Sequence, residues 1–396
     1  MSVHAIGRAP ATVDVGPRDA VEDRLRSLEH RLAARAGRLL GYPESMRFDH
    51  TPLLRFMRFN LDNLGDPYSD LLYGVNSTEF EREVIAWFER RYDLPPEDAW
   101  GYVTSSGSEG NLYGLYLGRE ALPDAVLYHS AATHYSVAKA GRLLRMDARV
   151  VACLPDGRID PAALAEAIRA DRGRPAVLCV NLGTTMTGAH DDIGDVVEVL
   201  ERAGVAYHLH ADAALSGMTL PFMAGAPRIS FDLPIESVSV SGHKFLGAPF
   251  PCGIVVTRRE HVARIQTRIP YIGALDATIG GSRNGQAPLY LWHAIHTRGG
   301  PDGSGFAEEV ATCRDNAVFL YEHLRVLGLD PLLNPHSLTV VFDEPGERLV
   351  RRWSLARAGG RAHVVCVPHA THDLLGTFLA ELTRDVARRE TEGDRR

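Results

Sequence analysis

Short apolar runs alternate with longer amphipathic segments between residues 100 and 257, and this alternation restricts the fold more than any other feature of the sequence. Short runs rich in β-branched side chains are typical of buried strands, and longer segments with apolar side chains at helical spacing are typical of helices. Strands are predicted at 100–103, 126–129, 150–154, 176–181, 207–211, 237–240 and 254–257, and helices at 109–122, 135–144, 161–169, 194–204 and 260–268. This order predicts an α/β fold, in which helices cover both faces of a mainly parallel, seven-stranded sheet.

The segments on either side of this region follow different patterns. We interpret residues 1–16 as a leader. A helix is predicted from Asp19 to Leu40, and Gly41 and Pro43 are expected to end it. Residues 47–77 show no regular hydrophobic period and are expected to be irregular. A second helix is predicted at 79–92. The C-terminal part is predicted as a compact α+β unit, with helices at 307–327, at 347–356 and from about 371, and strands at 338–343 and 363–367. We therefore expect a leader and helix that act as a dimer arm (1–50), a large domain (51–295) and a small C-terminal domain (296–396).

The composition is that of a soluble globular protein with a mildly acidic charge. Lys and Arg number 43 against 50 Asp and Glu, which gives a net charge of −7, and the interior holds no dense basic run. Nucleic acid is therefore not an expected partner. No apolar stretch reaches the roughly 18 residues of a membrane span, and residues 1–15 lack the features of a secretory signal. We expect a cytoplasmic enzyme with no membrane partner.

The cysteines and histidines do not predict a metal site. The five cysteines lie far apart and form no Cys-x-x-Cys pair, so neither a disulfide framework nor a structural zinc is expected. His208 and His210 share one face of a predicted strand, which is a spacing that could hold a metal. No third ligand is evident near them in the sequence, and we expect no metal there.

Three segments place reactive or anion-binding groups at the ends of predicted strands. Residues 104–111 (TSSGSEGN) lead from a strand into a helix, where small residues and free backbone amides favour an anion such as phosphate. Asp212 ends an apolar strand, where a carboxylate is costly unless it meets a cation or hydrogen-bond donors. Residues 237–245 end the next strand with hydroxyls, His243 and Lys244. In a parallel sheet all three segments lie at the carboxyl edge, where ligands collect.

These groups together match the requirements of pyridoxal phosphate. A lysine amine such as that of Lys244 holds this coenzyme as a Schiff base. A carboxylate such as Asp212 keeps the pyridine nitrogen protonated, and the Ser-Gly-Ser turn at 106–108 suits the phosphate. An aromatic or imidazole ring over the pyridine face would complete the site, and His134 is the candidate.

The sequence resembles the pyridoxal-phosphate-dependent amino-acid decarboxylases of group II, in the branch that holds bacterial histidine decarboxylases and plant serine decarboxylases. The resemblance covers roughly residues 40–385. It rests on ordered motifs: GYPES at 41–45, WGYVT at 100–104, EGN at 109–111, THYSVAK at 133–139, NLGTT at 181–185, HADAALSG at 210–217, SGHK at 241–244, PCG at 251–253 and GSRNG at 281–285. It implies a type I pyridoxal-enzyme fold and a homodimer with its active sites at the subunit interface.

The resemblance also implies roles for individual residues. Lys244 is the expected Schiff-base residue, Asp212 the expected partner of the pyridine nitrogen and His134 the ring that stacks on the coenzyme. Other expected coenzyme contacts are Ser106, Gly107, Ser108, Thr184, Ala214, Ser241, His243 and, from the neighbouring subunit, Ser282. Tyr73 and Gly74 are expected either to shape the pocket for the substrate side chain or to form a structural turn.

One departure concerns the proton that must reach the α-carbon after CO₂ leaves. Many related aromatic amino-acid decarboxylases use a tyrosine on a mobile loop, whereas the corresponding stretch here, 297–306 (TRGGPDGSGF), has no tyrosine. Its Gly and Pro content predicts mobility. His134, Lys244 or a water then supplies the proton, or the reaction takes an oxidative course to an aldehyde.

The sequence constrains the identity of the substrate less than it constrains the type of reaction. Residues 60–68, 73–77 and 231–241 look more like the serine decarboxylases, and residues 212–218 resemble the bacterial histidine enzymes. We expect L-serine to give ethanolamine, with L-histidine to histamine or a non-standard polar amino acid as alternatives. Two other classes are an aminotransferase or lyase of the same fold and a non-catalytic relative. Formation of a keto acid would favour the aminotransferase or lyase, and failure to take up the coenzyme would favour the non-catalytic relative.

Overall fold

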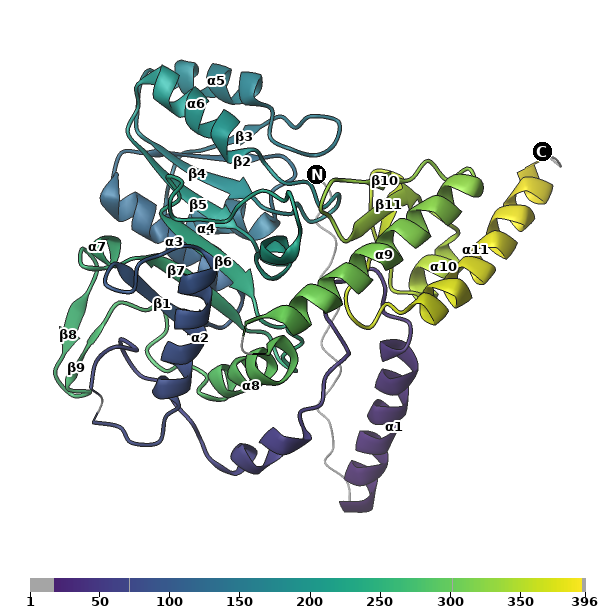
Figure 1. The fold of residues 1–396 in the computed structure, drawn as a ribbon, viewed down its shortest axis with the longest axis horizontal. Coiled ribbons are helices and arrows are strands. Elements are labelled where there is room, and N and C mark those ends of the chain that lie inside the picture. The colour runs from purple at the N-terminus through teal and green to yellow at the C-terminus, as the bar shows by residue number, and fades with distance from the viewer. Residues whose placement is uncertain (1–17, 71, 301, 394–396) are drawn as a thin grey trace.

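The computed structural model describes residues 18–70, 72–300 and 302–393, and its large domain is built on one seven-stranded sheet (Figure 1). The strand order is β1-β7-β6-β5-β4-β2-β3, in which β7 runs antiparallel to both of its neighbours. The strands are β1 (Ala99–Thr104), β2 (Val126–Ser130), β3 (Ala148–Val151), β4 (Ala176–Asn181), β5 (Tyr207–Asp212), β6 (Ser237–Ser241) and β7 (Gly253–Arg258). The expected α/β fold with a mainly parallel sheet is confirmed.

Helices cover both faces of this sheet, as the continuous apolar strands require. On one face Leu127 and Val177 pack with Val137 of α4, and on the other Tyr128 and Leu178 pack in a core with residues of α2, α5 and α6. The helices of the large domain are α2 (Thr78–Arg91), α3 (Gly107–Ala121), α4 (Tyr135–Leu143), α5 (Pro161–Ala170), α6 (Ile193–Ala203), α7 (Arg259–Val262) and α8 (Gln286–Ala294). Short 3₁₀ turns lie at Thr51–Arg58, Ser216–Met218 and Leu220–Phe222, and a π turn at Ile295–Gly299 follows α8.

The smaller C-terminal domain has its own antiparallel sheet, in the order β10-β11-β13-β12, and its own core. Its elements are α9 (Ser304–Val326), β10 (Leu332–Leu333), β11 (Thr339–Asp343), α10 (Glu347–Arg352), β12 (Ala356–Ala358), β13 (Arg361–Val365) and α11 (His372–Gly393). Leu40 also belongs to this core: it is fully buried, and its backbone bonds to Trp353 and Val365. The segment after α1 is thereby fixed to the far end of the chain.

The helix α9 belongs to both cores. Phe306, Val310 and Cys313, in its first half, pack in the core of the large domain. Ala317, Leu320 and Leu324, in its second half, pack in the core of the C-terminal domain. Figure 1 shows α9 running from one domain to the other.

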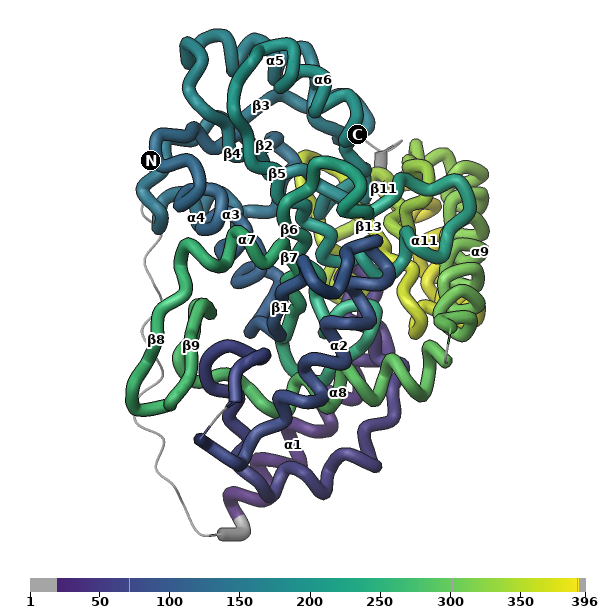
Figure 2. The backbone as a smooth tube through the Cα atoms, turned by 60° about the vertical axis from the view of Figure 1, so that its left-hand side comes forward, coloured from purple at the N-terminus to yellow at the C-terminus, as the bar shows by residue number. Residues whose placement is uncertain are grey.

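Some local predictions differ from the structure. The helix expected from Asp19 to Leu40 is α1 (Arg18–Ala36), which ends earlier because Leu40 enters the C-terminal core. The helix expected at 260–268 is wrong beyond Val262: Thr267–Ile269 forms β8, which pairs with β9 (Ala274–Asp276). Pro270 and Gly273, whose φ is +72°, fit the turn between these strands and not a helix. Figure 2 shows this β8–β9 hairpin projecting from the large domain.

Mobility remains a prediction for the stretch 297–306, whose two ends make contacts with the rest of the protein. Arg298 pairs with Glu309 at 2.6 Å and donates a hydrogen bond to the Leu246 carbonyl at 2.7 Å. Phe306 is fully buried. Both ends of the stretch are therefore anchored, and the described residues outside helical turns are Gly300, Asp302 and Gly303.

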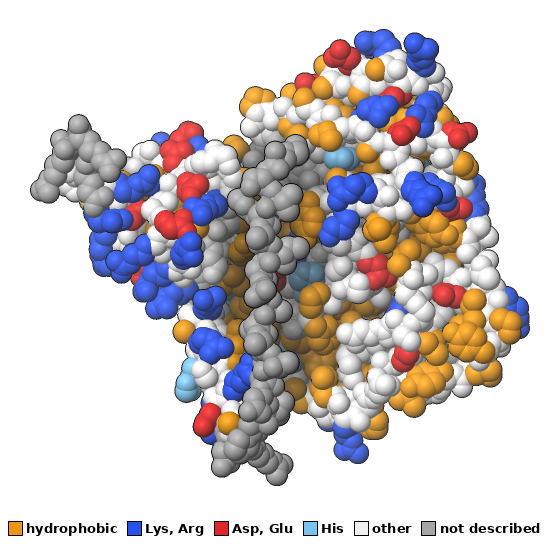
Figure 3. Space-filling view, turned by 180° about the vertical axis from the view of Figure 1, so that it is seen from behind, with side chains coloured by type: hydrophobic (Ala, Val, Ile, Leu, Met, Phe, Trp, Pro, Cys, Tyr) orange, Lys and Arg blue, Asp and Glu red, His pale blue; other side chains and the backbone are white. Residues whose placement is uncertain are grey.

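Several apolar side chains are exposed on the surface. Seen from behind, hydrophobic side chains gather over the large domain (Figure 3). The helix α1 extends away from the rest (Figure 1), and its residues from Ala20 to Arg35 are all exposed. The leader expected at 1–16 lies outside the described residues, and none of the described helices is long and apolar enough to cross a membrane.

Candidate active site

A cavity of about 460 Å³ lies at the carboxyl edge of the sheet, between the two domains. It collects ten of the residues predicted for the site, which come from the ends of β5 and β6, the starts of α3 and α4, and the loops that follow β4, β5 and β6: Ser106, Gly107, Ser108, His134, Thr184, Asp212, Ala214, Ser241, His243 and Lys244. Residues more than 130 positions apart in the chain therefore meet where the topology of a parallel sheet places ligands.

A second cavity, of about 520 Å³, lies elsewhere and has no comparable chemistry. Its charged side chains include Arg158 and Arg228, which form ion pairs with Asp156 at 2.7 Å and with Asp93 at 2.9 Å. His190 in its wall contacts Ser216 Oγ at 3.2 Å. Because these groups already satisfy one another, the cavity around Lys244 is the candidate active site.

Lys244 is the nucleophile that the cavity offers. Burial lowers the pKa of its amine, and the carboxylates of Asp212 and Glu44 oppose that shift. A lowered pKa increases the fraction of neutral amine, which is the form that attacks a carbonyl carbon. The Lys244 carbonyl accepts a hydrogen bond from the Ser45 amide at 3.0 Å, so the segment 41–45 lies directly against this residue.

Asp212 is a buried carboxylate held by two donors. Its side chain accepts a hydrogen bond from Asn111 Nδ2 at 2.7 Å and one from the Ala214 amide at 3.2 Å. The residue is 7% exposed and lines the same cavity as Lys244. A buried carboxylate in this position is suited to hold a proton on a ring nitrogen of a bound ligand.

The start of α3 lines the cavity and is suited to bind an anion. Ser106 caps the helix by accepting a hydrogen bond from the Glu109 amide at 3.4 Å. A Cβ atom at Gly107 would lie 2.5 Å from Ser241 Oγ, so only glycine allows this approach of the helix to β6. Ser106, Gly107 and Ser108 line the cavity, at a helix start that suits a phosphate.

His134 is the N-cap of α4, and its ring is fixed by its neighbour. Nδ1 accepts a hydrogen bond from the Ser136 amide at 3.3 Å and lies 2.8 Å from Ser136 Oγ. Burial lowers the pKa of the imidazole, and the Asp212 carboxylate opposes this shift. His134 is thus a neutral, oriented ring in the cavity wall, and a lysine, a carboxylate, a phosphate cradle and a flat ring fit pyridoxal phosphate.

Three predicted site residues do not line the cavity of the protomer. Ser282 is exposed, Tyr73 is 36% exposed and donates a hydrogen bond to the Asn60 carbonyl, and Gly74 has no atom within 4 Å of where a Cβ would lie. All three lie near one edge of the large domain, because Asn63 and Val75 pair with backbone groups of Arg283 and Asp62.

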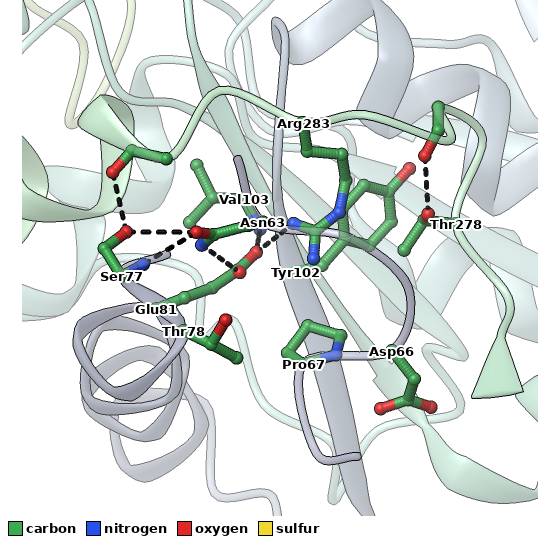
Figure 4. Close-up of polar contacts among 12 residues, drawn as sticks. Asn63, Asp66, Pro67, Ser77, Thr78, Glu81, Tyr102, Val103, Thr278 and Arg283 are labelled. Carbon is green, nitrogen blue, oxygen red and sulfur yellow. Dashed lines mark hydrogen bonds and ion pairs between the residues drawn. The ribbon is translucent and has the colours of Figure 1, made fainter. Parts of the chain in front are cut away.

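A buried ion pair fixes that edge (Figure 4). Arg283 and Glu81 have side chains that are 5% and 0% exposed and form a direct ion pair. Glu81 also accepts hydrogen bonds from Asn63 Nδ2 at 2.7 Å and from the Val103 amide at 2.8 Å. The second guanidinium nitrogen of Arg283 donates to the Gly65 carbonyl at 3.0 Å. Ser282 is therefore presented at the surface by a rigid neighbour.

The prediction from sequence missed part of the cavity wall. Residues 41–44 and 337–339 line it, together with Asn111, Asn181, Ser216 and His363. The GYPES, EGN, NLGTT and HADAALSG motifs contain residues 41–44, Asn111, Asn181 and Ser216, but the motifs alone do not show which side chains face a ligand. The residues from the C-terminal domain carry no motif, and only the docking of that domain places them.

Comparison with known proteins identifies the family of the chain. The pyridoxal-dependent decarboxylase conserved domain matches residues 76–327. The chain belongs to this family. The enzyme is therefore a carboxy-lyase that uses pyridoxal phosphate to decarboxylate a small amino acid, and neither an aminotransferase nor a non-catalytic relative is supported.

Two groups of relatives and one solved structure are informative. The decarboxylase is 44% identical to serine decarboxylase 1 of Oryza sativa subsp. japonica over 94% of this chain and 78% of that one. It is 45% identical to the histidine decarboxylase of Pseudomonas fluorescens over 83% of this chain and 82% of that one. The structure of L-methionine decarboxylase from Streptomyces sp. 590, in complex with L-methionine methyl ester, superposes with a TM-score of 0.86 and 26% identity, covering 93% of this chain and 95% of that one.

Proposed function

We propose that the decarboxylase converts L-serine to ethanolamine and CO₂. The observation that carries this proposal is the extent of the match: similar identities, 44% and 45%, extend over 94% of the chain for a serine decarboxylase and over 83% for a histidine decarboxylase. Since the compared proteins act on different amino acids, residues outside the shared coenzyme motifs carry the distinction. L-histidine is the second candidate, because the identity to that relative is equally high.

Glu44 supports a substrate with a polar side chain. Its carboxylate lines the cavity, is half-buried, and has no hydrogen bond or ion pair with the described residues. It lies close enough to raise the pKa of both Lys244 and His243. A half-buried carboxylate without a partner is costly, and a substrate hydroxyl or imidazole N–H would satisfy it.

Each step of the proposed reaction uses a group whose position is described above. When bound, pyridoxal phosphate supplies an electron-accepting ring for the bond that breaks. Lys244 Nζ holds the coenzyme between turnovers, Asp212 keeps a proton on the pyridine nitrogen, and the start of α3 holds the phosphate. His134 orients the ring from one face. The pocket would hold the substrate carboxylate out of the ring plane, an orientation that selects decarboxylation.

The proton that replaces CO₂ has three sources in this cavity. They are the imidazole of His134, the amine of Lys244 and a water molecule. The tyrosine-free stretch 297–306 is anchored by Arg298 and Phe306, so we do not assign this proton to a moving loop.

We also propose that the enzyme is a homodimer with active sites at the subunit interface. Val21, Leu25, Leu28 and Leu32 form one exposed apolar face of α1, at helical spacing. A helix whose apolar face is exposed in the described part of the chain is suited to bind a second copy. Ser282, Tyr73 and Gly74 would then contribute to the partner's cavity. Light scattering should give twice the chain mass of 43.4 kDa, and L25E/L32E should shift the protein toward monomer.

A cytoplasmic location is part of the same proposal. The cysteines at 153, 179, 252, 313 and 366 are all free, and four of them are buried. Free thiols are typical of proteins in reducing compartments. The partners are then small-molecule substrates and a second copy of the chain.

The substrate is tested by incubating the coenzyme-loaded enzyme with each of the twenty amino acids and detecting amine, aldehyde and keto acid by mass spectrometry. Ethanolamine as the dominant product supports the proposal. Histamine as the dominant product would replace serine by histidine. Aldehyde with peroxide would indicate an oxidative reaction, and the absence of any product from enzyme with bound coenzyme would point to a non-standard amino acid; each of these outcomes overturns the serine proposal.

A further inference from the structure

Asn111, on the first turns of α3, is buried at the centre of a polar network beneath the cavity. It is 2% exposed, and its side-chain amide makes four hydrogen bonds. Nδ2 lies 2.7 Å from Asp212 Oδ2 and 3.1 Å from Ser136 Oγ, and Oδ1 lies 2.5 Å from Ser239 Oγ and 3.1 Å from His210 Nε2. A side-chain amide has two donor hydrogens and two acceptor lone pairs, so every position is used.

The direction of each bond follows from Asp212. An ionised carboxylate only accepts hydrogen bonds, so the amide must turn its NH₂ group toward Asp212. Its oxygen then faces His210 and Ser239 and must receive hydrogens from both. His210 therefore donates from Nε2, and its Nδ1 accepts from Ser237 Oγ at 2.8 Å. Burial lowers the pKa of His210 to about 3, so this histidine stays neutral and keeps that tautomer.

The second amide hydrogen sets the state of His134. Asn111 donates to Ser136 Oγ, which leaves the Ser136 hydroxyl hydrogen free to donate to His134 Nδ1 at 2.8 Å. The Ser136 amide donates to the same nitrogen at 3.3 Å. Because Nδ1 accepts two hydrogen bonds, the ring proton of neutral His134 is on Nε2.

We propose that Asn111 is a positioning residue that holds Asp212 ready for the pyridine nitrogen and His134 in its Nε2–H tautomer. One amide thereby couples the helix that binds the phosphate, the carboxylate that binds the ring nitrogen and the imidazole over the ring face. The proposal rests on the roles given above to Asp212 and His134. It does not depend on which amino acid is the substrate.

The test replaces Asn111 by Asp, which keeps the shape, removes both N–H donors and, when ionised, adds a negative charge beside Asp212. The purified apoenzyme is titrated with pyridoxal phosphate to obtain the coenzyme Kd, and the long-wavelength absorption band of the loaded enzyme is titrated with pH. We expect the coenzyme Kd to rise at least about 10-fold and the midpoint of the pH titration to move. With the substrate that the product assay identifies, kcat should fall about 10- to 100-fold and KM should change less than about 3-fold.

The matched control is Asn63→Asp. Asn63 is also fully buried and also donates from Nδ2 to a buried carboxylate, Glu81, at the same distance of 2.7 Å, but it does not line the cavity. This control should lose thermal stability and keep the coenzyme Kd and the pH midpoint of the band. Equal changes in both variants would show a merely structural role and overturn the proposal.

A further variant, Ser136→Ala, keeps the proposal testable if N111D does not fold. Ser136→Ala removes only the hydroxyl between Asn111 and His134, so the pH profile of kcat should shift while the coenzyme Kd stays within about 2-fold. An unchanged pH profile would overturn the part of the proposal that concerns His134. The coenzyme readouts need no substrate, so their outcome is separate from the test of serine as the substrate.

Discussion

The two walls of the cavity differ in the pairing of the carboxylates that they present: Asp212 accepts two hydrogen bonds, whereas Glu44 accepts none from the described residues. On the wall formed by the strand ends, Asp212, Asn111 and His134 each have partners within 3.3 Å. On the wall formed by residues 41–44 and the C-terminal domain, Glu44 has no hydrogen bond with the described residues, and Tyr42 is 48% exposed. We call the first wall the paired wall, since its hydrogen-bond network fixes the side chains proposed to hold the coenzyme. We call the second the open wall, since it leaves Glu44 for a substrate to satisfy, and we propose that this carboxylate influences the choice of substrate.

The largest effect should come from the paired wall, at Lys244. Lys244→Ala should reduce turnover by more than about 10⁴-fold, since no other amine in the cavity can hold the coenzyme. The sequence contains only one other lysine, Lys139, so Lys139→Arg is the matched control. Turnover and melting temperature are measured for both. Full activity in K244A would contradict the proposed mechanism.

Asp212→Asn keeps the shape of the paired wall and removes its negative charge. Without that charge the pyridine nitrogen loses its proton, so kcat should fall about 10²- to 10⁴-fold. Steady-state kinetics with a matched melting curve measure this effect. A rate near that of the wild type would show that another group protonates the ring.

Glu44 tests the open wall. Glu44→Gln should lower kcat/KM for serine about 10-fold, and Glu44→Ala about 30-fold, by weakening one hydrogen bond to the substrate. The coenzyme Kd should stay within about 2-fold in both variants. If the coenzyme affinity falls as much as kcat/KM, the distinction between the two walls is wrong.

The last prediction concerns the protonation of three buried histidines. Burial lowers the pKa of His208 and of His210 to about 3 and that of His190 to about 4, from 6.5. Between pH 6.5 and about 4 the unfolded chain binds protons that the folded chain excludes, so the free energy of unfolding should decrease as the pH falls. Each histidine contributes about 1.4 kcal/mol per pH unit.

Urea unfolding between pH 7 and pH 5 measures this dependence. His208→Gln removes one titrating group and should give a shallower slope than the wild type. An identical slope in this variant would mean that His208 is already protonated in the folded state.

Much of the paired wall was predictable because it follows from topology. Strands rich in buried β-branched residues define the sheet, and the polar residues that end them, such as Asp212 and Ser241, must then meet at one edge. The hydrogen-bond partners were not predictable in the same way. The network joins Asn111 to His210 and Ser239, 99 and 128 positions away, and no local pattern records such distances.

The errors have local physical causes. The helix expected through Leu40 ends at Ala36 because burial of Leu40 in the C-terminal core outweighs its helical period. The helix expected at 260–268 ends at Val262, since Thr267–Ile269 finds a strand partner beyond Pro270. The open wall was largely missed because Ser337, Leu338 and Thr339 reach the cavity only through the packing of the C-terminal domain.

The helix α9 has a consequence for anyone who would recombine this enzyme with a relative. Since Phe306 and Val310 fill one core while Leu320 and Leu324 fill the other, the helix cannot be inherited from a single parent without mismatching one of its two surroundings. Chimeras that exchange the C-terminal domain should therefore carry both sets of contact residues, or accept a cavity in whichever core is left unmatched. A chimera that takes the open wall from a relative in order to change its substrate should lose stability, unless each half of α9 is taken from the parent whose core it contacts.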